Sequence, residues 1–191
     1  MDAGLGMLRT RVSQLSAQPV TVLIDGRSGA GKSTVARQLV ESWPRPDPVQ
    51  LISMDDIYPG WEGLRAASES IITEVLEPRS RGVVGRWRRF DWGSGDFAEW
   101  HRVDPALSLL VEGCGCVTRA SASLADLRVW LDSPAADRKR RALARDGEMF
   151  EPRWESWSRQ EDALYATEGT SQLANLTLVN VTSAARSGGP R

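Results

Sequence analysis

The chain has 191 residues, which suits one domain and leaves little room for a second of ordinary size. Apolar residues make up 41% of it, so a core can form without disulfides or a structural metal. A formal net charge of −1 excludes an overall field that would recruit nucleic acid or an anionic membrane, and we expect neither as a partner. No apolar run approaches the roughly 18 residues of a membrane span, and the first residues do not resemble a signal peptide. We therefore expect a cytoplasmic protein.

The N-terminal part alternates helical and strand patterns. Residues 4–17 carry apolar side chains at helical spacing, and Pro19 ends the helix that this spacing predicts. The continuous apolar run over 20–24 is rich in β-branched residues, which predicts a strand buried on both faces, as in a parallel sheet. A glycine-rich turn follows, then a predicted helix over 33–43 and a second predicted strand over 49–53.

The alternation continues toward the C-terminus. In chain order, the patterns predict a helix over 65–79, an extended segment over 86–92, a strand over 107–111, a strand over 127–131, helices over 134–146 and 151–168, and a last strand over 176–179. Strands alternating with helices indicate an α/β fold whose parallel sheet is covered on both faces and collects ligands at the carboxyl ends of its strands. We expect one domain over 1–182 and a disordered tail over 183–191, which is small and polar.

A phosphate-binding motif lies between the first predicted strand and the next helix. Residues 26–33 read G-R-S-G-A-G-K-S, which is the pattern G-x-x-x-x-G-K-S in its required context. Glycines let backbone N–H groups face phosphate oxygens, and the helix N-terminus adds its positive end. Lys32 suits the β- and γ-phosphates and the Ser33 hydroxyl suits Mg²⁺, so we predict ATP and Mg²⁺ as ligands. The predicted nucleotide contacts of this loop are Gly26, Ser28, Gly29, Ala30, Gly31, Lys32, Ser33 and Thr34.

Two further predicted strands end in carboxylates. Asp55 follows the strand over 49–53, where it could accept the proton of an attacking hydroxyl or help to hold the metal. Glu112 ends the strand over 107–111, which is the Walker B arrangement of an acid that reaches the magnesium shell. Each could instead be a turn, cap or solvated strand-end residue. Cys114 and Cys116 suit neither a structural disulfide nor zinc, and we interpret them as small apolar side chains near the end of a buried strand.

A basic helix follows the fourth sheet strand. Arg138, Arg141 and Arg145 are spaced by three and four residues and so share one face. Three arginines together suit a triphosphate during transfer, although a charged surface helix would show the same residues. Gly147 indicates a break, so residues 138–168 are predicted to act as a lid that excludes water.

These elements, in this order, resemble the P-loop nucleoside and nucleotide kinases, and within them the uridine kinase branch. That family has an Asp-x-Phe-Tyr type motif, here the segment 55–58, and an apolar strand ending Glu-Gly, here at 112–113. The resemblance implies a three-layer P-loop NTPase fold with a five-stranded parallel sheet, a central P-loop strand and a helical lid. It also implies that Asp55 is the catalytic base, and that Arg141 and Arg145 bind phosphate beside the catalytic Lys32, with Arg138 on the same nucleotide.

The acceptor side follows the family only in part. A Tyr-Asp-Phe type segment contacts the nucleoside in that family, and Phe90, Asp91 and Trp92 look similar here; with Asp55 and Tyr58 they are the predicted acceptor contacts. The family has a histidine soon after this segment, whereas this chain has the turn-like stretch 93–95, so the acceptor pocket is predicted to differ. The tryptophans and arginines of 86–102 could bind an acceptor or pack a core with arginines outside. A structural role is favoured for His101, the only histidine.

The sequence thus predicts an ATP-dependent kinase that transfers the γ-phosphoryl group to a hydroxyl or phosphate of a small-molecule acceptor, with a nucleoside or nucleotide favoured. A kinase for a non-nucleoside metabolite and a regulatory P-loop NTPase module are the alternatives. The combined acid, lysine and arginines favour an enzyme. The sequence does not name the acceptor, separate ATP from GTP, or decide whether the chain forms a homo-oligomer.

Overall fold

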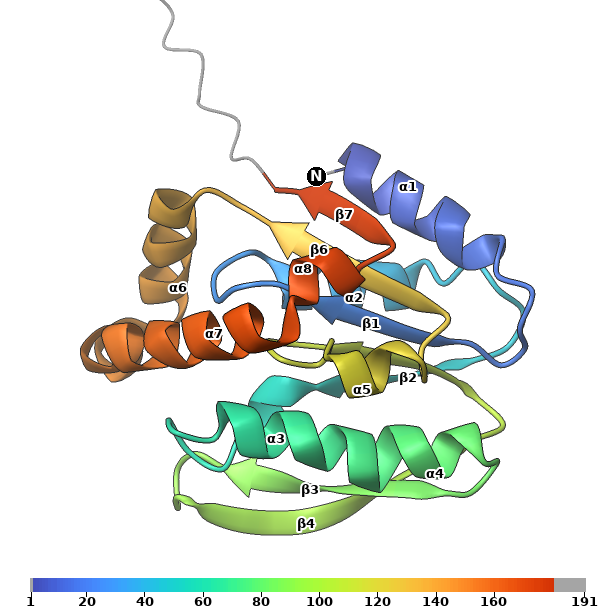
Figure 1. Cartoon of the computed structure of the whole chain (residues 1–191), viewed down its shortest axis with the longest axis horizontal. Coiled ribbons are helices and arrows are strands. Elements are labelled where there is room, and N and C mark those ends of the chain that lie inside the picture. Colours follow the sequence, from blue (N-terminus) through green and yellow to red (C-terminus); the bar gives the residue numbers. More distant parts are fainter. Residues whose placement is uncertain (1, 181–191) are drawn as a thin grey trace, which may run out of the picture.

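The computed structural model describes residues 2–180, apart from the side chains of Asp2, Asp146, Glu148 and Met149; the tail predicted over 183–191 lies outside this range. Five strands form one parallel sheet in the order β2-β5-β1-β6-β7, with the P-loop strand central as predicted (Figure 1). They are β1 (Thr21–Asp25), β2 (Val49–Ser53), β5 (Ser108–Glu112), β6 (Leu127–Asp132) and β7 (Leu176–Val179).

Side chains of β1 alternate between two cores, which explains its continuous apolar sequence. Val22 and Ile24 pack in a cluster with α1 (Asp2–Ser13) and α2 (Lys32–Glu41), on one face of the sheet. Leu23 belongs to the cluster on the other face. The prediction of an α/β fold with a covered parallel sheet is confirmed.

The second face is covered by a helical rod that corresponds to the helix predicted over 65–79. It consists of α3 (Leu64–Ser70), the π-helical segment η2 (Ile71–Leu76) and α4 (Glu77–Ser80), and its apolar stripe enters the core. The short helices α5 (Arg119–Ala122) and α8 (Thr170–Leu173) lie farther along the chain, and the 3-10 turn η1 (Met54–Asp56) follows β2 directly.

A separate antiparallel hairpin lies below the helical rod in Figure 1. The predicted extended segment is its first strand, β3 (Gly85–Asp91); the second, β4 (Asp96–Val103), was not predicted. Asp91 shapes the turn between them, since its Oδ1 accepts hydrogen bonds from the N–H groups of Gly93 (2.9 Å) and Ser94 (3.3 Å). His101 lies on β4 and stacks on Trp87 with ring centroids 4.3 Å apart, in keeping with the structural role favoured for it.

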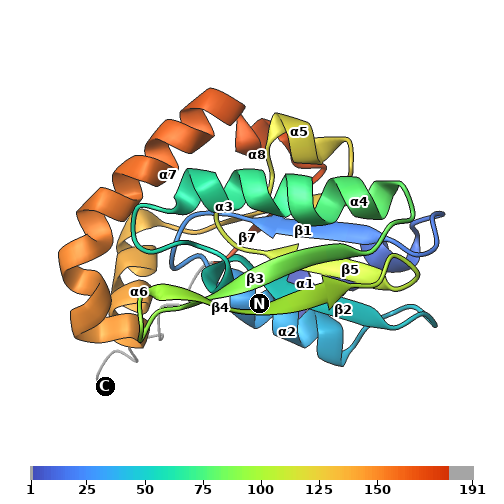
Figure 2. The same ribbon diagram turned by 90° about the horizontal axis from the view of Figure 1, so that it is seen from below.

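Two long helices stand at the end of the sheet toward which the arrows of β1 and β6 point (Figures 1 and 2). They are α6 (Ala135–Phe150) and α7 (Trp154–Glu168), joined by the 3-10 turn η3 (Glu151–Arg153). Gly147 leaves helical geometry inside α6, with φ 51° and ψ −133°, so the break predicted there is present. No helix within residues 2–180 is long and apolar enough to cross a membrane.

Gly26 at the end of β1 provides a stability prediction. Its φ is 149°, and a Cβ at this position would collide with the carbonyl oxygen of Leu131 in β6. Gly26→Ala is therefore expected to lower the free energy of unfolding by more than about 2 kcal/mol, measured by chemical denaturation. Gly82→Ala is the matched control, because Gly82 also has a positive φ, 69°, but its Cβ would meet nothing within 4 Å. Equal losses in the two variants would contradict the collision.

Candidate active site

The loop between β1 and α2 surrounds one buried lysine. The Lys32 side chain is only 7% exposed, and its Nζ donates to the carbonyl oxygen of Arg27 at 3.2 Å and lies 3.3 Å from the Cys114 sulfur. Burial acts to lower the pKa of Lys32, but the charges of neighbouring groups, Glu112 and Glu161 among them, raise it above its ordinary value. The ammonium is therefore held charged at the base of the loop.

A cavity of about 210 Å³ opens over this loop. Its lining includes the loop residues Ser28, Gly29, Gly31, Lys32, Ser33 and Thr34. Gly26 and Ala30, which were also predicted to contact nucleotide, are not in this lining and shape the loop from behind. The charged side chains in the lining are four cations and two carboxylates: Lys32, Arg37, Arg141 and Arg145, and Asp55 and Glu112. The excess of positive charge suits a polyphosphate.

Glu112, at the end of β5, is 3% exposed and sits among hydroxyl groups. Ser53 at the end of β2 donates to it at 2.7 Å, and Ser33 also hydrogen-bonds to it. Burial raises the pKa of Glu112, while Lys32 lowers it. A carboxylate and two hydroxyls are the hard oxygen donors that Mg²⁺ prefers. The described residues contain no group of three or more His, Cys, Asp or Glu side chains placed to hold a metal.

The raised pKa of Glu112 gives a pH prediction. Only the carboxylate form of Glu112 can bind Mg²⁺, so the Mg²⁺-dependent part of ADP affinity is expected to fall as the pH is lowered. Because the pKa of Glu112 is raised, this fall should begin above pH 4.5, the ordinary pKa of glutamate. Calorimetric titrations with and without Mg²⁺ at several pH values would measure this fall. Glu112→Gln should abolish the difference at every pH, which separates Glu112 from titration of the nucleotide itself. If the Mg²⁺-dependent affinity fell only below pH 4.5, the effect of burial on Glu112 would be contradicted.

A second cavity, of about 460 Å³, adjoins the first and has aromatic walls. They are formed by Tyr58, Trp61, Trp92, Phe150 and Trp157. The protein itself uses the polar groups of three of these rings: Trp92 Nε1 donates to the Asp55 carbonyl (2.8 Å), Tyr58 to the Cys114 carbonyl (2.9 Å), and Trp157 Nε1 to Glu161 (3.1 Å). These three side chains therefore offer ring surface, rather than hydrogen bonds, to a ligand.

Three residues line both cavities: Ser28, Asp55 and Arg145. Asp55 lies 3.8 Å from the Arg145 guanidinium, and each side chain is more than half exposed. Asp56 lines only the aromatic cavity. A group between the two cavities would thus meet the Asp55 carboxylate, which can receive a hydroxyl proton, and the Arg145 guanidinium, which can stabilise a transferring anion.

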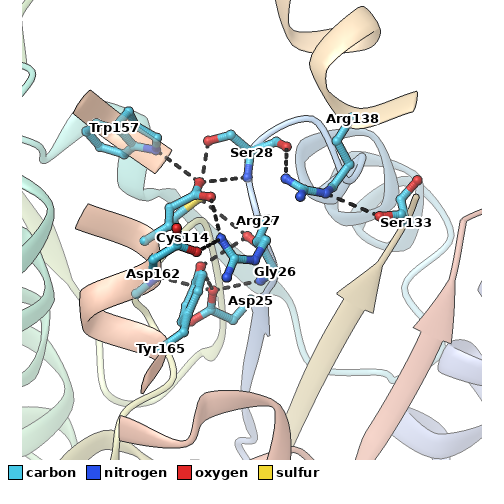
Figure 3. A network of polar contacts seen from close by, with 12 residues as sticks. Asp25, Gly26, Arg27, Ser28, Cys114, Ser133, Arg138, Trp157, Asp162 and Tyr165 are labelled. Carbon is cyan, nitrogen blue, oxygen red and sulfur yellow. Dashed lines mark hydrogen bonds and ion pairs between the residues drawn. The ribbon is translucent and has the colours of Figure 1, made fainter. Parts of the chain in front are cut away.

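Other predicted site residues lie outside the cavity walls. Phe90 is buried and packs edge-on against Trp92 at 5.4 Å, so it supports the wall from behind. Asp91 is engaged in the hairpin turn. Arg138 donates to the carbonyl oxygens of Ser28 and Ser133, each at 3.2 Å, and so braces the back of the loop (Figure 3). Direct contact of these three with a ligand stays a prediction.

Arg141 lies in the wall of the phosphate cavity and also contacts the loop. Its Nε donates to the Gly29 carbonyl oxygen at 2.9 Å, and its Nη2 hydrogen-bonds to the Ser133 hydroxyl. Together with Arg138 it fastens the first half of α6 to the P-loop. Whether residues 138–168 move as a lid stays a prediction.

A polar network behind the loop was not expected from the sequence (Figure 3). Asp25 is fully buried and accepts hydrogen bonds from the N–H groups of Gly26 (2.7 Å), Val117 (2.8 Å) and Gly115 (3.1 Å) and from the Tyr165 hydroxyl (2.8 Å). Burial raises the pKa of Asp25 to about 6, against the opposing effect of these hydrogen bonds and of Lys32. Asp25 thus joins the start of the P-loop to the loop after β5 and to α7.

Cys114 belongs to the same network. It is buried as expected, but it lies in the wall of the phosphate cavity, beside Lys32, and not simply in an apolar strand end. Burial raises the pKa of its thiol to about 12, so the sulfur is neutral.

No family model matches the chain, and no curated protein matches it in sequence. Solved structures match its fold. A possible uridine kinase from Bacillus stearothermophilus is 18% identical, with 93% of this chain and 98% of that chain covered and a TM-score of 0.69. A candidate fructose transport system kinase from Silicibacter is 19% identical over 91% and 98%, with a TM-score of 0.56, and D-glycerate 3-kinase from Cryptococcus neoformans is 10% identical over 95% and 94%, with a TM-score of 0.53. The chain therefore has the α/β fold of P-loop kinases, with the five-stranded parallel sheet that its sequence predicted.

Proposed function

We propose that the chain is an ATP-dependent kinase that transfers the γ-phosphoryl group to a hydroxyl of a small molecule held in the aromatic cavity. The observation that carries this proposal is the wall that the two cavities share, formed by Ser28, Asp55 and Arg145. A phosphoryl group that crosses this wall from one cavity to the other would pass a base and a cation.

Each residue of the phosphate cavity then has a physical role. Lys32 and the P-loop N–H groups bind the β- and γ-phosphates, and Arg141 and Arg145 offset the charge that develops on the transferring group. Ser33 and Glu112 would hold Mg²⁺, which when bound neutralises phosphate charge. Asp55 orients the acceptor hydroxyl and accepts its proton.

The walls of the larger cavity favour an acceptor with a flat ring, such as a nucleoside or nucleotide. Five aromatic side chains line the cavity and offer ring surface for stacking, and three of its four other lining residues belong to the shared wall. Two of the similar structures are named as kinases of fructose transport and of D-glycerate. A polyol or hydroxy acid is thus the second candidate, but it would find few hydrogen-bonding partners among the aromatic rings.

ATP consumption with and without an acceptor tests the proposal. The protein would be incubated with Mg²⁺ and ATP alone, and then with nucleosides, nucleotides, sugars and hydroxy acids in turn. We expect turnover only with an acceptor, and fastest with a ring-bearing one. Turnover that does not depend on any acceptor would contradict the proposal and favour a regulatory NTPase module.

A further inference from the structure

Glu161 is a buried carboxylate for which the proposed transfer reaction has no use. It lies on α7, is 1% exposed, and its Oε1 accepts hydrogen bonds from the Ser28 N–H (2.8 Å) and the Trp157 indole N–H (3.1 Å). The Cys114 thiol donates to the same oxygen at 3.3 Å, and Oε2 lies 3.6 Å from the Arg27 guanidinium. A carboxylate removed from water is costly unless such bonds are made, so these donors are held firmly in place.

Two of the donors to Glu161 differ in the cavities that they line. Ser28 lies in the wall that the cavities share, within the P-loop. Trp157 lines only the aromatic cavity, where its ring meets Tyr58 edge-on with centroids 4.8 Å apart. One carboxylate oxygen therefore links the backbone of the phosphate-binding loop to the wall of the acceptor cavity.

The same face of α7 makes two more contacts with the loop (Figure 3). Asp162 pairs with Arg27 at 2.6 Å, and the Tyr165 hydroxyl donates to Asp25 at 2.8 Å. The segment 25–28 is thus fixed to one helix over little more than one turn. A ligand that shifts the Trp157 ring must then disturb either its bond to Glu161 or the position of the loop.

We propose that Glu161 is a positioning residue that couples the two cavities energetically. By holding the Ser28 N–H and the Trp157 indole on one oxygen, it makes the occupancy of the acceptor cavity affect the affinity for nucleotide. By thermodynamic linkage, bound nucleotide must change the affinity for the acceptor by the same factor. The inference rests on the proposed function in assigning the acceptor to the aromatic cavity, but the coupling can be measured without knowing the acceptor.

A double-mutant cycle on ADP binding tests this coupling. Trp157→Phe keeps a ring in the cavity but removes the indole N–H, and Glu161→Leu keeps a side chain of similar size but accepts no hydrogen bond. With Mg²⁺–ADP as the probe in calorimetry, Trp157→Phe is expected to weaken binding about tenfold, although Trp157 does not line the phosphate cavity. In the Glu161→Leu background the same change should have little further effect.

Trp154→Phe is the matched control, since Trp154 lies on the same helix and packs against Phe150 at 5.5 Å but lines neither cavity. It should leave ADP affinity unchanged in both backgrounds. Additive effects in the cycle, or no effect of Trp157→Phe, would overturn the coupling, and a purely structural role would lower Tm while leaving the cycle additive. Should Glu161→Leu fail to fold, Trp157→Phe compared with Trp154→Phe decides alone. If the unmodified chain did not bind ADP, the proposed function would be overturned together with the coupling. If it bound ADP normally and the cycle were additive, only the coupling would be overturned.

Discussion

Replacing Lys32 by methionine is expected to abolish phosphoryl transfer while the chain stays folded. Methionine has a similar length and suits a site that is 7% exposed, so the packing is kept and the positive charge is lost. The negative charges of Asp25, Glu112 and Glu161 would then lack the ammonium that now opposes them. We expect turnover to fall by about 10³-fold or more, as for loss of a preorganised charge at a reacting phosphate, and ADP affinity to fall with it. Lys32→Ala should have the same effect on transfer.

A coupled assay measures the turnover, calorimetry measures the ADP affinity, and a thermal melt shows whether the chain stays folded. Lys139→Met is the control, because Lys139 is half exposed on α6 and pairs only weakly with Glu155, at 3.5 Å. It should retain the activity of the unmodified chain. Retention of about a tenth or more of the turnover by Lys32→Met would contradict the role given to this lysine.

Replacing Asp55 by asparagine has the second largest expected effect. Asparagine has nearly the same shape but cannot accept a proton, so kcat should fall by about 10²- to 10⁴-fold. ADP affinity should change little, because the affinity for phosphates comes chiefly from the P-loop and its cations. The loss of Asp55 also removes the partner that lies 3.8 Å from Arg145, and this exposed pair should matter little for stability.

The neighbouring Asp56 provides a sharp comparison for Asp55. It lines the aromatic cavity but not the phosphate cavity, whereas Asp55 lines both. Asp56→Asn is therefore expected to alter KM for the acceptor more than kcat. If both asparagine variants lost kcat equally, or if Asp55→Asn kept it, the assignment of Asp55 as the base would be wrong.

The parts of the fold that could be predicted from the sequence are those whose pattern lies within a short run of contiguous residues. The buried strand over 20–24, the glycine-rich loop and the helix after it depend on neighbouring side chains and so leave a local pattern. The strand-end acids, Asp55 and Glu112, follow from topology, because carboxyl ends of parallel strands gather at one edge. The break at Gly147 could also be predicted, because glycine weakens a helix at the position where it occurs.

The unpredicted parts depend on contacts between distant segments. Glu161 and Ser28 are far apart in the chain, and nothing near either residue shows that a helix carboxylate will accept a loop N–H. A weak signal existed, because Trp157, Glu161 and Tyr165 recur every four residues and place an acid on an otherwise aromatic helix face. The strand β4 was missed because its alternation of polar and aromatic residues was interpreted as a binding segment rather than as half of a hairpin.

The destination of the γ-phosphoryl group is the measurement that tests the central claim most directly. ATP labelled at the γ-phosphate would be incubated with the protein, Mg²⁺ and each acceptor class, and the products separated by mass. The two adjoining cavities predict label covalently attached to the hydroxyl of a ring-bearing acceptor, with little inorganic phosphate, and far slower formation of this product by Asp55→Asn. Label released only as inorganic phosphate, at a rate independent of every acceptor, would contradict a kinase.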